Sequence, residues 1–391
     1  MHSNVWLVAT VWMALALLAS LISIRVGVSV ALVEILLGVV AGNFLDVHTT
    51  PWIDFLATFG SGLLTFLAGA EIDPDSLRRH LKPALVIGAV GFTAPFLAAG
   101  AFAYWVAHWE RHAAYIAGIA LSTTSVAVVY AVMVETGLNR TEIGKLILAA
   151  CFVNDFGTVL ALGIVFANFN GWLALFVAVT ATVLWYLPRL TRYVIRSVGQ
   201  RVSEPEVKFV FLILFGLGGL AQVARSEAVL PAYLVGLVIA GVFVRDRALM
   251  DRMRAIAFSL LTPFYFLKAG LYVSLPSVAA GALLIAALLL TKMGSKVVGI
   301  WPLTRAFAFE RREGVYTTLL MSTGLTFGTI SALFGLTNHI ITQAQYTVLV
   351  TVVIGSAIVP TLIAQRWFAP AAAGPPAVAP PAPVPQPASA I

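Results

Sequence analysis

One carboxylate stands in the middle of a long apolar run of the sequence. Asn154 and Asp155 are adjacent, and the apolar residues around them extend from about position 143 to about position 168. In a helix, Asp155 would lie roughly 18 Å from the start of this run, near the centre of a bilayer. An ionisable side chain there costs on the order of 3 kcal/mol to insert, and membrane proteins keep such residues mainly for ion or proton traffic. Asp155 is therefore the candidate binding residue for a cation and a proton, and the Asn154 carbonyl can help to position Asp155 or a loop.

Two polar stretches interrupt other apolar runs. Residues 121–126 read LSTTSV and residues 321–329 read MSTGLTFGT. Hydroxyl side chains can satisfy backbone groups freed by local unwinding, and glycine tolerates the angles that unwinding needs, so we predict two broken helices. Close packing of intact helices through small residues is the alternative. If both helices break at the midplane, exposed carbonyls and helix ends would face Asp155. The break positions are Ser122, Thr123, Thr124, Ser125, Ser322, Thr323 and Gly324.

Three lysines lie in apolar surroundings. Lys292 and Lys296 are four residues apart and share one helical face, so either can neutralise Asp155 when no cation is bound, and their spacing does not choose between them. Lys268 follows PFYFL (263–267), where it either extends its amine to the membrane surface or is a third candidate partner of Asp155.

The composition places these residues in a membrane. Of 391 residues 60% are hydrophobic and only 10% are charged, and the mean hydropathy is +0.95, whereas a soluble globule carries about 25% charged residues. The net charge of +7 does not indicate nucleic-acid binding, because the basic residues fall in short loops between apolar runs. Cys151 is the only cysteine, which excludes an intramolecular disulfide.

Thirteen apolar segments of membrane-spanning length are expected, separated by Gly, Pro or charged residues. The first has no basic region before it, so we interpret it as a retained helix rather than a signal peptide. The approximate spans are 5–24, 28–45, 52–71, 84–107, 113–134, 143–168, 171–187, 207–224, 230–244, 256–274, 278–301, 314–334 and 344–365.

Loop charge fixes the orientation, because Lys and Arg gather on the cytoplasmic side. Only Arg111 and Arg225 fall on the side that this rule assigns to the outside, and the N-terminus lies on that side, whereas the C-terminus lies in the cytoplasm. We expect a bacterial-type inner membrane. Nineteen basic residues fall on the other side: Arg25, Arg78, Arg79, Lys82, Arg140, Lys145, Arg189, Arg192, Arg196, Arg201, Lys208, Arg245, Arg247, Arg252, Arg254, Arg305, Arg311, Arg312 and Arg366.

The two halves of the chain resemble each other at a shift of about 200 residues. Ser122-Thr123 corresponds to Ser322-Thr323, and Phe66-Leu67 to Phe266-Leu267. A shift of seven segments inverts the second copy, and inverted repeats support alternating access to a site near the midplane. The predicted divisions are residues 1–187 (first half), 188–206 (cytoplasmic linker), 207–368 (second, inverted half) and 369–391, an Ala/Pro tail expected to be disordered.

Glu34 and Glu71 lie toward the cytoplasmic ends of their segments. Each is either solvated at the membrane surface or lines a funnel that attracts cations. The sequence contains no phosphate-binding glycine loop, metal-ligand cluster or nucleophilic triad, so we expect a transporter without a cofactor rather than an enzyme.

These motifs together resemble those of the monovalent cation/proton antiporters, in particular the NapA-like sodium/proton antiporters of the second cation/proton antiporter family. The resemblance covers about residues 5–366 and rests on VEILLGVVAG (33–42), FLAGAEIDP (66–74), STTSVA (122–127), VNDFG (153–157), SEPE (203–206) and SKVVGI (295–300). It implies an all-α NhaA/NapA-like fold, two crossing broken helices, a homodimer in which a scaffold holds a mobile core, and elevator-type alternating access.

The same resemblance assigns roles to single residues. Asp155 matches the ion- and proton-binding aspartate, Thr124 and Ser125 match the unwound crossing, and Lys296 matches the lysine paired with the aspartate region in electrogenic members. NapA-like members usually have two adjacent aspartates, whereas this chain has Asn154 at the first position, a pattern typical of the electroneutral first family. One carboxylate favours one-for-one exchange.

We therefore expect exchange of Na⁺, or of Li⁺ or K⁺, for H⁺ across the bilayer, with Asp155 as the sodium ligand and no role in nucleic-acid binding. Two alternatives stay open. A sodium-coupled organic-anion symporter would need cationic contacts, for which Lys268 with Tyr265 is the only hint, and a potassium/proton efflux system usually has a nucleotide-binding domain.

Overall fold

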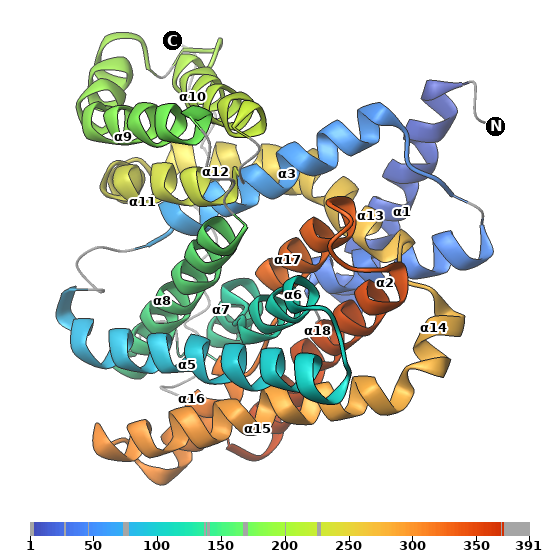
Figure 1. Ribbon diagram of the computed structural model, residues 1–391. Coiled ribbons are helices and arrows are strands. Elements are labelled where there is room, and N and C mark those ends of the chain that lie inside the picture. Colours follow the sequence, from blue (N-terminus) through green and yellow to red (C-terminus); the bar gives the residue numbers. More distant parts are fainter. Residues whose placement is uncertain are drawn as a thin grey trace, which may run out of the picture.

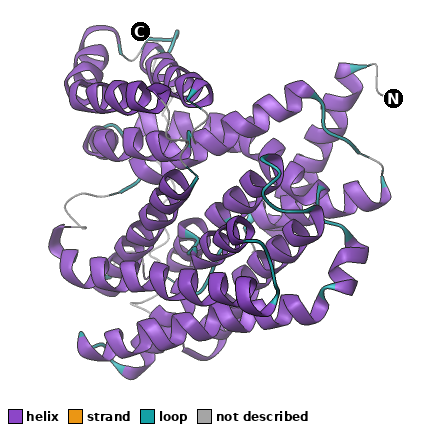
Figure 2. Cartoon of the chain, in the orientation of Figure 1, coloured by secondary structure: helices purple, strands orange, loops and turns teal. Residues whose placement is uncertain are grey.

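The computed structural model describes residues 4–26, 29–45, 47–72, 78–136, 138, 141–166, 171–199, 201–224, 228–368 and 370. Every regular element in these ranges is helical, which confirms the predicted all-α fold class (Figures 1 and 2). Residues 371–391 of the predicted tail lie outside the described residues. The helices, with η for a π-helical turn, are α1 (Val5–Val26), α2 (Val30–Phe44), α3 (Pro51–Ala70), α5 (Leu81–Ala101), η1 (Phe102–Val106), α6 (Arg111–Ser122), α7 (Val126–Glu135), α8 (Glu142–Val165), α9 (Gly171–Val198), α10 (Pro205–Val223), α11 (Val229–Arg245), α12 (Arg247–Ile256), η3 (Ala257–Leu261), α13 (Thr262–Leu271), α14 (Leu275–Ala280), α15 (Ala282–Ala306), α16 (Arg311–Met321), α17 (Thr326–Thr337), α18 (Gln343–Ile363) and η4 (Ala364–Phe368).

Most of these helices are long and apolar enough to cross a membrane. Ten spans among the described residues meet that description, and Val30–Phe44 and Val229–Phe243 are shorter apolar helices. Each of the thirteen predicted segments coincides with one helix or with a run of consecutive helices. The predicted segment 256–274 is the bent run of η3 and α13, which follows α12.

The end of the seventh segment differs from the prediction. Pro188 was expected to end it at residue 187, but α9 continues to Val198 with Pro188 inside the helix. A proline removes one backbone hydrogen bond and can bend a helix without ending it, and the residues after Pro188 have helix-compatible side chains.

The helices form two groups that contact each other. The first, which we call the core bundle, contains α5, α6, α7, α8, α15, α16, α17 and α18. In it α5 packs on α6, α8 and α15, and α15 packs on α16 and α18. The second, the scaffold bundle, contains α1, α2, α3, α9, α10, α11, α12 and α13. In Figure 1, α9, α10 and α11 lie together at one end, while α5 and α15 run side by side at the other.

Glycines allow two helix pairs of the scaffold bundle to approach closely. In the α2–α13 pair, a side chain at Gly38 would collide with the backbone carbonyl of Leu267. In the α11–α3 pair, a side chain at Gly236 would collide with the backbone carbonyl of Phe66. Small residues give membrane helices this close packing, and each pair joins a helix from one half of the chain to a helix from the other.

Candidate functional site

Two core helices are interrupted at the hydroxyl-rich stretches. The chain leaves helical geometry between α6 and α7 at residues 123–125, and between α16 and α17 at residues 322–325. Side chains of each break bond to carbonyls of the preceding turn: Ser122 Oγ donates to the Ile119 carbonyl at 2.8 Å, and Ser322 Oγ to that of Thr318 at 2.7 Å. The hydroxyls thus occupy acceptors at the ends of the first half-helices, where backbone partners are missing.

The two breaks cross and bond to each other. Thr124 Oγ1 donates a hydrogen bond to the Met321 carbonyl at 2.8 Å. The Ser125 backbone N–H donates to the Thr323 carbonyl at 3.2 Å. Both contacts join residues about 200 positions apart, and Thr123, Thr124, Ser125 and Thr323 are each fully buried.

Asn154 ties α8 to the first break with both ends of its amide. Its Oδ1 accepts a hydrogen bond from the Thr124 backbone N–H at 2.9 Å, and its Nδ2 donates to the Ser122 carbonyl at 3.3 Å. A carboxylate at this position could accept the first bond but could not donate the second. The residue is therefore a bridge between α8 and the unwound backbone. Its carbonyl contacts the loop, which is one of the two expected roles, whereas the bond donated by its Nδ2 was not expected from the sequence.

Asp155 lies next to this bridge and is 1% exposed. Its Oδ1 atom is buried and has no hydrogen-bond partner. Buried polar atoms are nearly always paired, so an unpaired carboxylate oxygen one residue from the Asn154 bridge is available to a ligand or a proton. Among the described residues no group of three or more His, Cys, Asp and Glu is placed to hold a metal ion, so oxygen atoms of the crossing would have to complete a cation site around Asp155.

The two lysines of α15 reach different parts of the crossing. Lys296 Nζ donates to Thr124 Oγ1 at 2.8 Å and to the Thr123 carbonyl at 3.4 Å, and it interacts electrostatically with Asp155. Lys292 Nζ contacts Gly324 at the second break and has no hydrogen-bond partner. Both side chains are fully buried. Geometry therefore associates Lys296, rather than Lys292, with the part of the crossing that Asn154 and Asp155 share.

The two glutamates singled out in the sequence are not part of the crossing. Glu71, at the end of α3, forms an ion pair with Arg254 of α12 at 2.9 Å. Glu34 is 1% exposed, so it is not solvated at a membrane surface, and its Oε2 atom has no hydrogen-bond partner.

Tyr233 and Tyr346 connect the two bundles and were not singled out in the sequence. The Tyr233 hydroxyl, on α11, donates to the Phe152 carbonyl of α8 at 3.1 Å. The Tyr346 hydroxyl, on α18, donates to the Ala269 carbonyl of α13 at 2.6 Å. Each is a tyrosine in an apolar helix, where a buried hydroxyl usually has a partner, and that was the available signal.

A cavity of about 1150 Å³ lies between the bundles. Its lining includes Asp54 and Lys268 from the scaffold bundle and His112, Val165, Phe334 and Asn338 from the core bundle. These residues lie near the start of α3 and α6 and near the end of α8, α13 and α17, so the cavity is at one end of the molecule. Lys268 Nζ pairs with Asp54 Oδ1 at 2.8 Å, so its ion-pair partner is Asp54 rather than Asp155.

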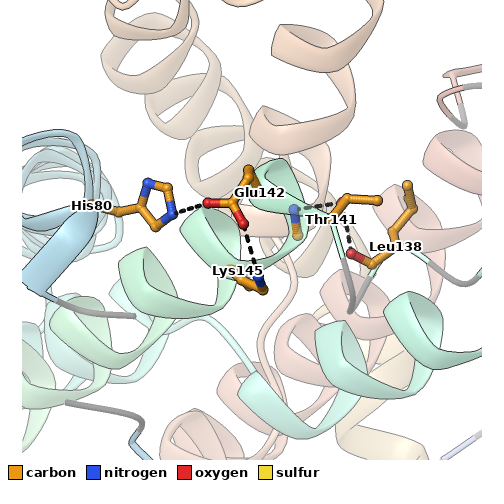
Figure 3. Close-up of polar contacts among 6 residues, drawn as sticks. His80, Leu138, Thr141, Glu142 and Lys145 are labelled. Atoms are coloured by element: carbon orange, nitrogen blue, oxygen red, sulfur yellow. Dashed lines mark hydrogen bonds and ion pairs between the residues drawn. The ribbon is translucent and has the colours of Figure 1, made fainter. Parts of the chain in front are cut away.

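The opposite end of α8 is held at the surface by polar contacts (Figure 3). Thr141 caps the helix by accepting a hydrogen bond from the Gly144 backbone N–H at 3.2 Å. The Glu142 carboxylate contacts His80, which precedes α5, at 2.9 Å and Lys145 at 2.7 Å. These side chains position the helix that carries Asp155 relative to α5.

Comparison with known proteins gives a consistent set of similarities. Residues 13–369 match the family described as sodium/hydrogen exchanger, transmembrane. The chain is 25% identical over 368 residues to the Na(+)/H(+) antiporter of Enterococcus hirae, covering 89% of this chain and 94% of that protein. It is also 25% identical over 338 residues to Cation/H(+) antiporter 18 of Arabidopsis thaliana, and the match covers 82% of this chain but only 42% of the longer plant protein.

The fold is also that of a solved structure. The sodium proton antiporter MjNhaP1 from Methanocaldococcus jannaschii superposes with a TM-score of 0.69 over 92% of this chain and 98% of that chain, at 15% sequence identity. At this identity the likeness establishes the fold alone.

Proposed function

Because this chain belongs to the sodium/hydrogen exchanger family, we propose that it exchanges Na⁺ for H⁺ across a membrane and that Asp155 binds the two ions in competition. Li⁺ and K⁺ are the alternative cations. The observation that carries the proposal is the buried Asp155 carboxylate oxygen without a partner, on the residue that follows Asn154, which bonds to the first break. A buried carboxylate can hold either a small cation or a proton, and binding one displaces the other.

Exchange is one for one in this proposal. Asp155 is the only carboxylate among the described residues that form the crossing, because position 154 is an asparagine, whose amide bonds to the first break. One carboxylate carries one proton in one direction and one monovalent cation in the other, so no net charge moves. Lys296 keeps its bonds to Thr124 and Thr123 and acts as the fixed positive charge near the emptied site.

Access alternates between the two sides by movement of the core bundle against the scaffold bundle. The cavity between the bundles lies at one end of the molecule only, as expected for one state of such a cycle. In the α2–α13 pair and in the α11–α3 pair, a helix of one half of the chain packs closely against a helix of the other half. This reciprocal pairing supports an inverted repeat with residues 1–187 and 207–368 as its halves. We propose that both crossing breaks travel with Asp155 in an elevator-type movement.

We also propose a bacterial-type inner membrane, with the N-terminus outside and the C-terminus in the cytoplasm, and a homodimer. The exposed aromatic and aliphatic side chains of α9 and α10, including Trp172, Trp185 and Leu212, suit contact with lipid or with a second copy. In this orientation the cavity is open to the outside. An organic-anion symporter is disfavoured because Lys268, its expected substrate contact, is occupied by Asp54.

Everted membrane vesicles test the proposal directly. Addition of NaCl, LiCl or KCl to vesicles with an imposed pH gradient should dissipate the gradient for wild type but not for Asp155→Asn. The matched control is Thr158→Val, because Thr158 is another fully buried polar residue of α8 whose hydroxyl bonds only within the helix. Equal activity of wild type and Asp155→Asn would contradict the assignment of Asp155, and a sustained current from proteoliposomes under a sodium gradient would contradict one-for-one exchange.

A further inference from the structure

We propose that the Lys268–Asp54 ion pair determines how strongly the cavity attracts the transported cation, with Lys268 lowering that attraction. The inference rests on the proposed function, since it concerns access of a cation to Asp155. Lys268 would then affect the apparent affinity for Na⁺ only on the side of the membrane to which the cavity opens.

The pair is placed where it can act on a cation in the cavity. Asp54 lies in the first turn of α3 and Lys268 in the last turn of α13, and both line the cavity. The Lys268 side chain is 7% exposed, whereas the Asp54 side chain is 44% exposed. Asp54 is thus the more exposed member of the pair, although its Oδ1, the atom 2.8 Å from Lys268 Nζ, is buried.

Few other charges contribute to this space. Besides Asp54 and Lys268, the titratable side chains among the described lining residues are His112 and Tyr265, and the remaining lining side chains are uncharged. Lys268 and Asp54 cancel each other's charge among the described lining residues. Removal of the lysine charge alone would make the lining negative, and removal of the aspartate charge alone would make it positive.

The size of the effect follows from Coulomb's law. A cation about 10 Å from one uncompensated carboxylate gains a local concentration of roughly 2-fold in a water-like medium and roughly 15-fold at the effective dielectric constant of a protein surface. Clefts with walls of low dielectric constant tend toward the higher value. Lys268→Gln should therefore lower the half-saturating Na⁺ concentration by about 2-fold to 15-fold on the cavity side.

A purely structural role of the same pair makes a different prediction. The pair also joins α3 to α13, which pack against each other in the scaffold bundle. If it acted only as a link between these helices, Lys268→Gln and Asp54→Asn would impair exchange in the same direction and on both sides. In the electrostatic proposal, the two substitutions shift the half-saturating concentration in opposite directions.

The experiment measures sodium-dependent proton movement in right-side-out and everted vesicles for Lys268→Gln, Asp54→Asn, the double variant and Lys268→Arg. We expect a lower half-saturating Na⁺ concentration for Lys268→Gln, a higher one for Asp54→Asn, and values within 2-fold of wild type for the double variant and Lys268→Arg. The shifts should be largest in right-side-out vesicles and should shrink when choline chloride raises the ionic strength, because salt screens charges.

Shifts of the same sign in both single variants, or a double variant worse than either, would overturn the inference. So would unchanged half-saturation in both single variants. If Lys268→Gln does not reach the membrane, Asp54→Asn supplies the same test with the opposite sign. This inference alone would be refuted if wild-type exchange depends on Asp155 but the half-saturating Na⁺ concentration is unchanged in Lys268→Gln and Asp54→Asn. Absence of exchange in wild type would instead refute the proposed function.

Discussion

Asn154→Asp is the substitution that best tests the reasoning about the crossing, because it changes one atom of the bridge. The acceptor to the Thr124 N–H is kept, and the donor to the Ser122 carbonyl, at 3.3 Å in the native protein, is replaced by a carboxylate oxygen. An unsatisfied buried acceptor costs about 1–3 kcal/mol. For a chain of this length we expect a fall in melting temperature of about 1–5 °C.

Asn154→Ala calibrates this expectation. It removes both bonds and orphans both the Thr124 N–H and the Ser122 carbonyl, so its cost should be about 2–6 kcal/mol. Thr158→Val, one turn along α8, is the control, since its hydroxyl bonds only to the Asn154 backbone carbonyl at 3.1 Å and that carbonyl is in the helix. Thermal unfolding in detergent, followed by size-exclusion chromatography with fluorescence detection, should rank the variants as control, Asn154→Asp and Asn154→Ala in order of increasing loss.

The same variant has a consequence for transport. The folded fraction of Asn154→Asp has a second carboxylate beside Asp155 that can hold a second proton, so we expect its exchange to generate a current that responds to an imposed voltage. If Asn154→Asp and Asn154→Ala melt with the control, the bridge does not stabilise the crossing. If the folded Asn154→Asp protein exchanges ions without current, the single carboxylate is not what sets the coupling ratio.

Two further predictions address contacts between helices. Gly236→Ala should destabilise the protein by several kcal/mol and lower its melting temperature, because the new methyl group collides with the Phe66 carbonyl. Gly241→Ala is the control on the same helix. Nothing lies within 4 Å of its added atom, so it should be neutral or slightly stabilising. Tyr233→Phe removes the hydrogen bond from α11 to the Phe152 carbonyl of α8, which is worth about 0.5–1.5 kcal/mol. Because this bond joins the two bundles, its loss should change the turnover rate in vesicles by about 2-fold to 10-fold with Asp155 intact. An unchanged rate would show that this bond does not stabilise one state of the cycle.

The sequence was sufficient for the fold because hydropathy reports directly on helices that cross a membrane. The thirteen segments coincide with helices of the structure, and the expected membership of the antiporter family is confirmed. The error at Pro188 has a physical origin, since a proline in a long helix removes one hydrogen bond and leaves the rest of the helix intact. The repeat and the roles at the crossing stay proposals, which the variants above test.

The site was less predictable because its contacts join residues far apart in the chain. A spacing of four places Lys292 and Lys296 on one helical face, but only the path of the breaks decides that Lys296 meets Thr124 while Lys292 meets Gly324. The partners of the Asn154 amide are likewise distant, because the Thr124 N–H and the Ser122 carbonyl lie about 30 residues earlier in the sequence. The pairing of Lys268 with Asp54 joins two helices more than 200 residues apart, and no local pattern indicates it.

The contacts among Thr124, Asn154, Lys296 and Met321 also have a thermodynamic consequence. They join the first break to α8, α15 and α16 close to the Asn154–Asp155 pair, so this part of the crossing cannot change shape unless several buried hydrogen bonds break at once. In the proposed alternating-access cycle, a site of fixed shape presents the same intrinsic affinity to both compartments. Any difference in apparent affinity between the two faces must then arise along the approach to the site, and the direction of net flux is set by the ion gradients rather than by the binding residues.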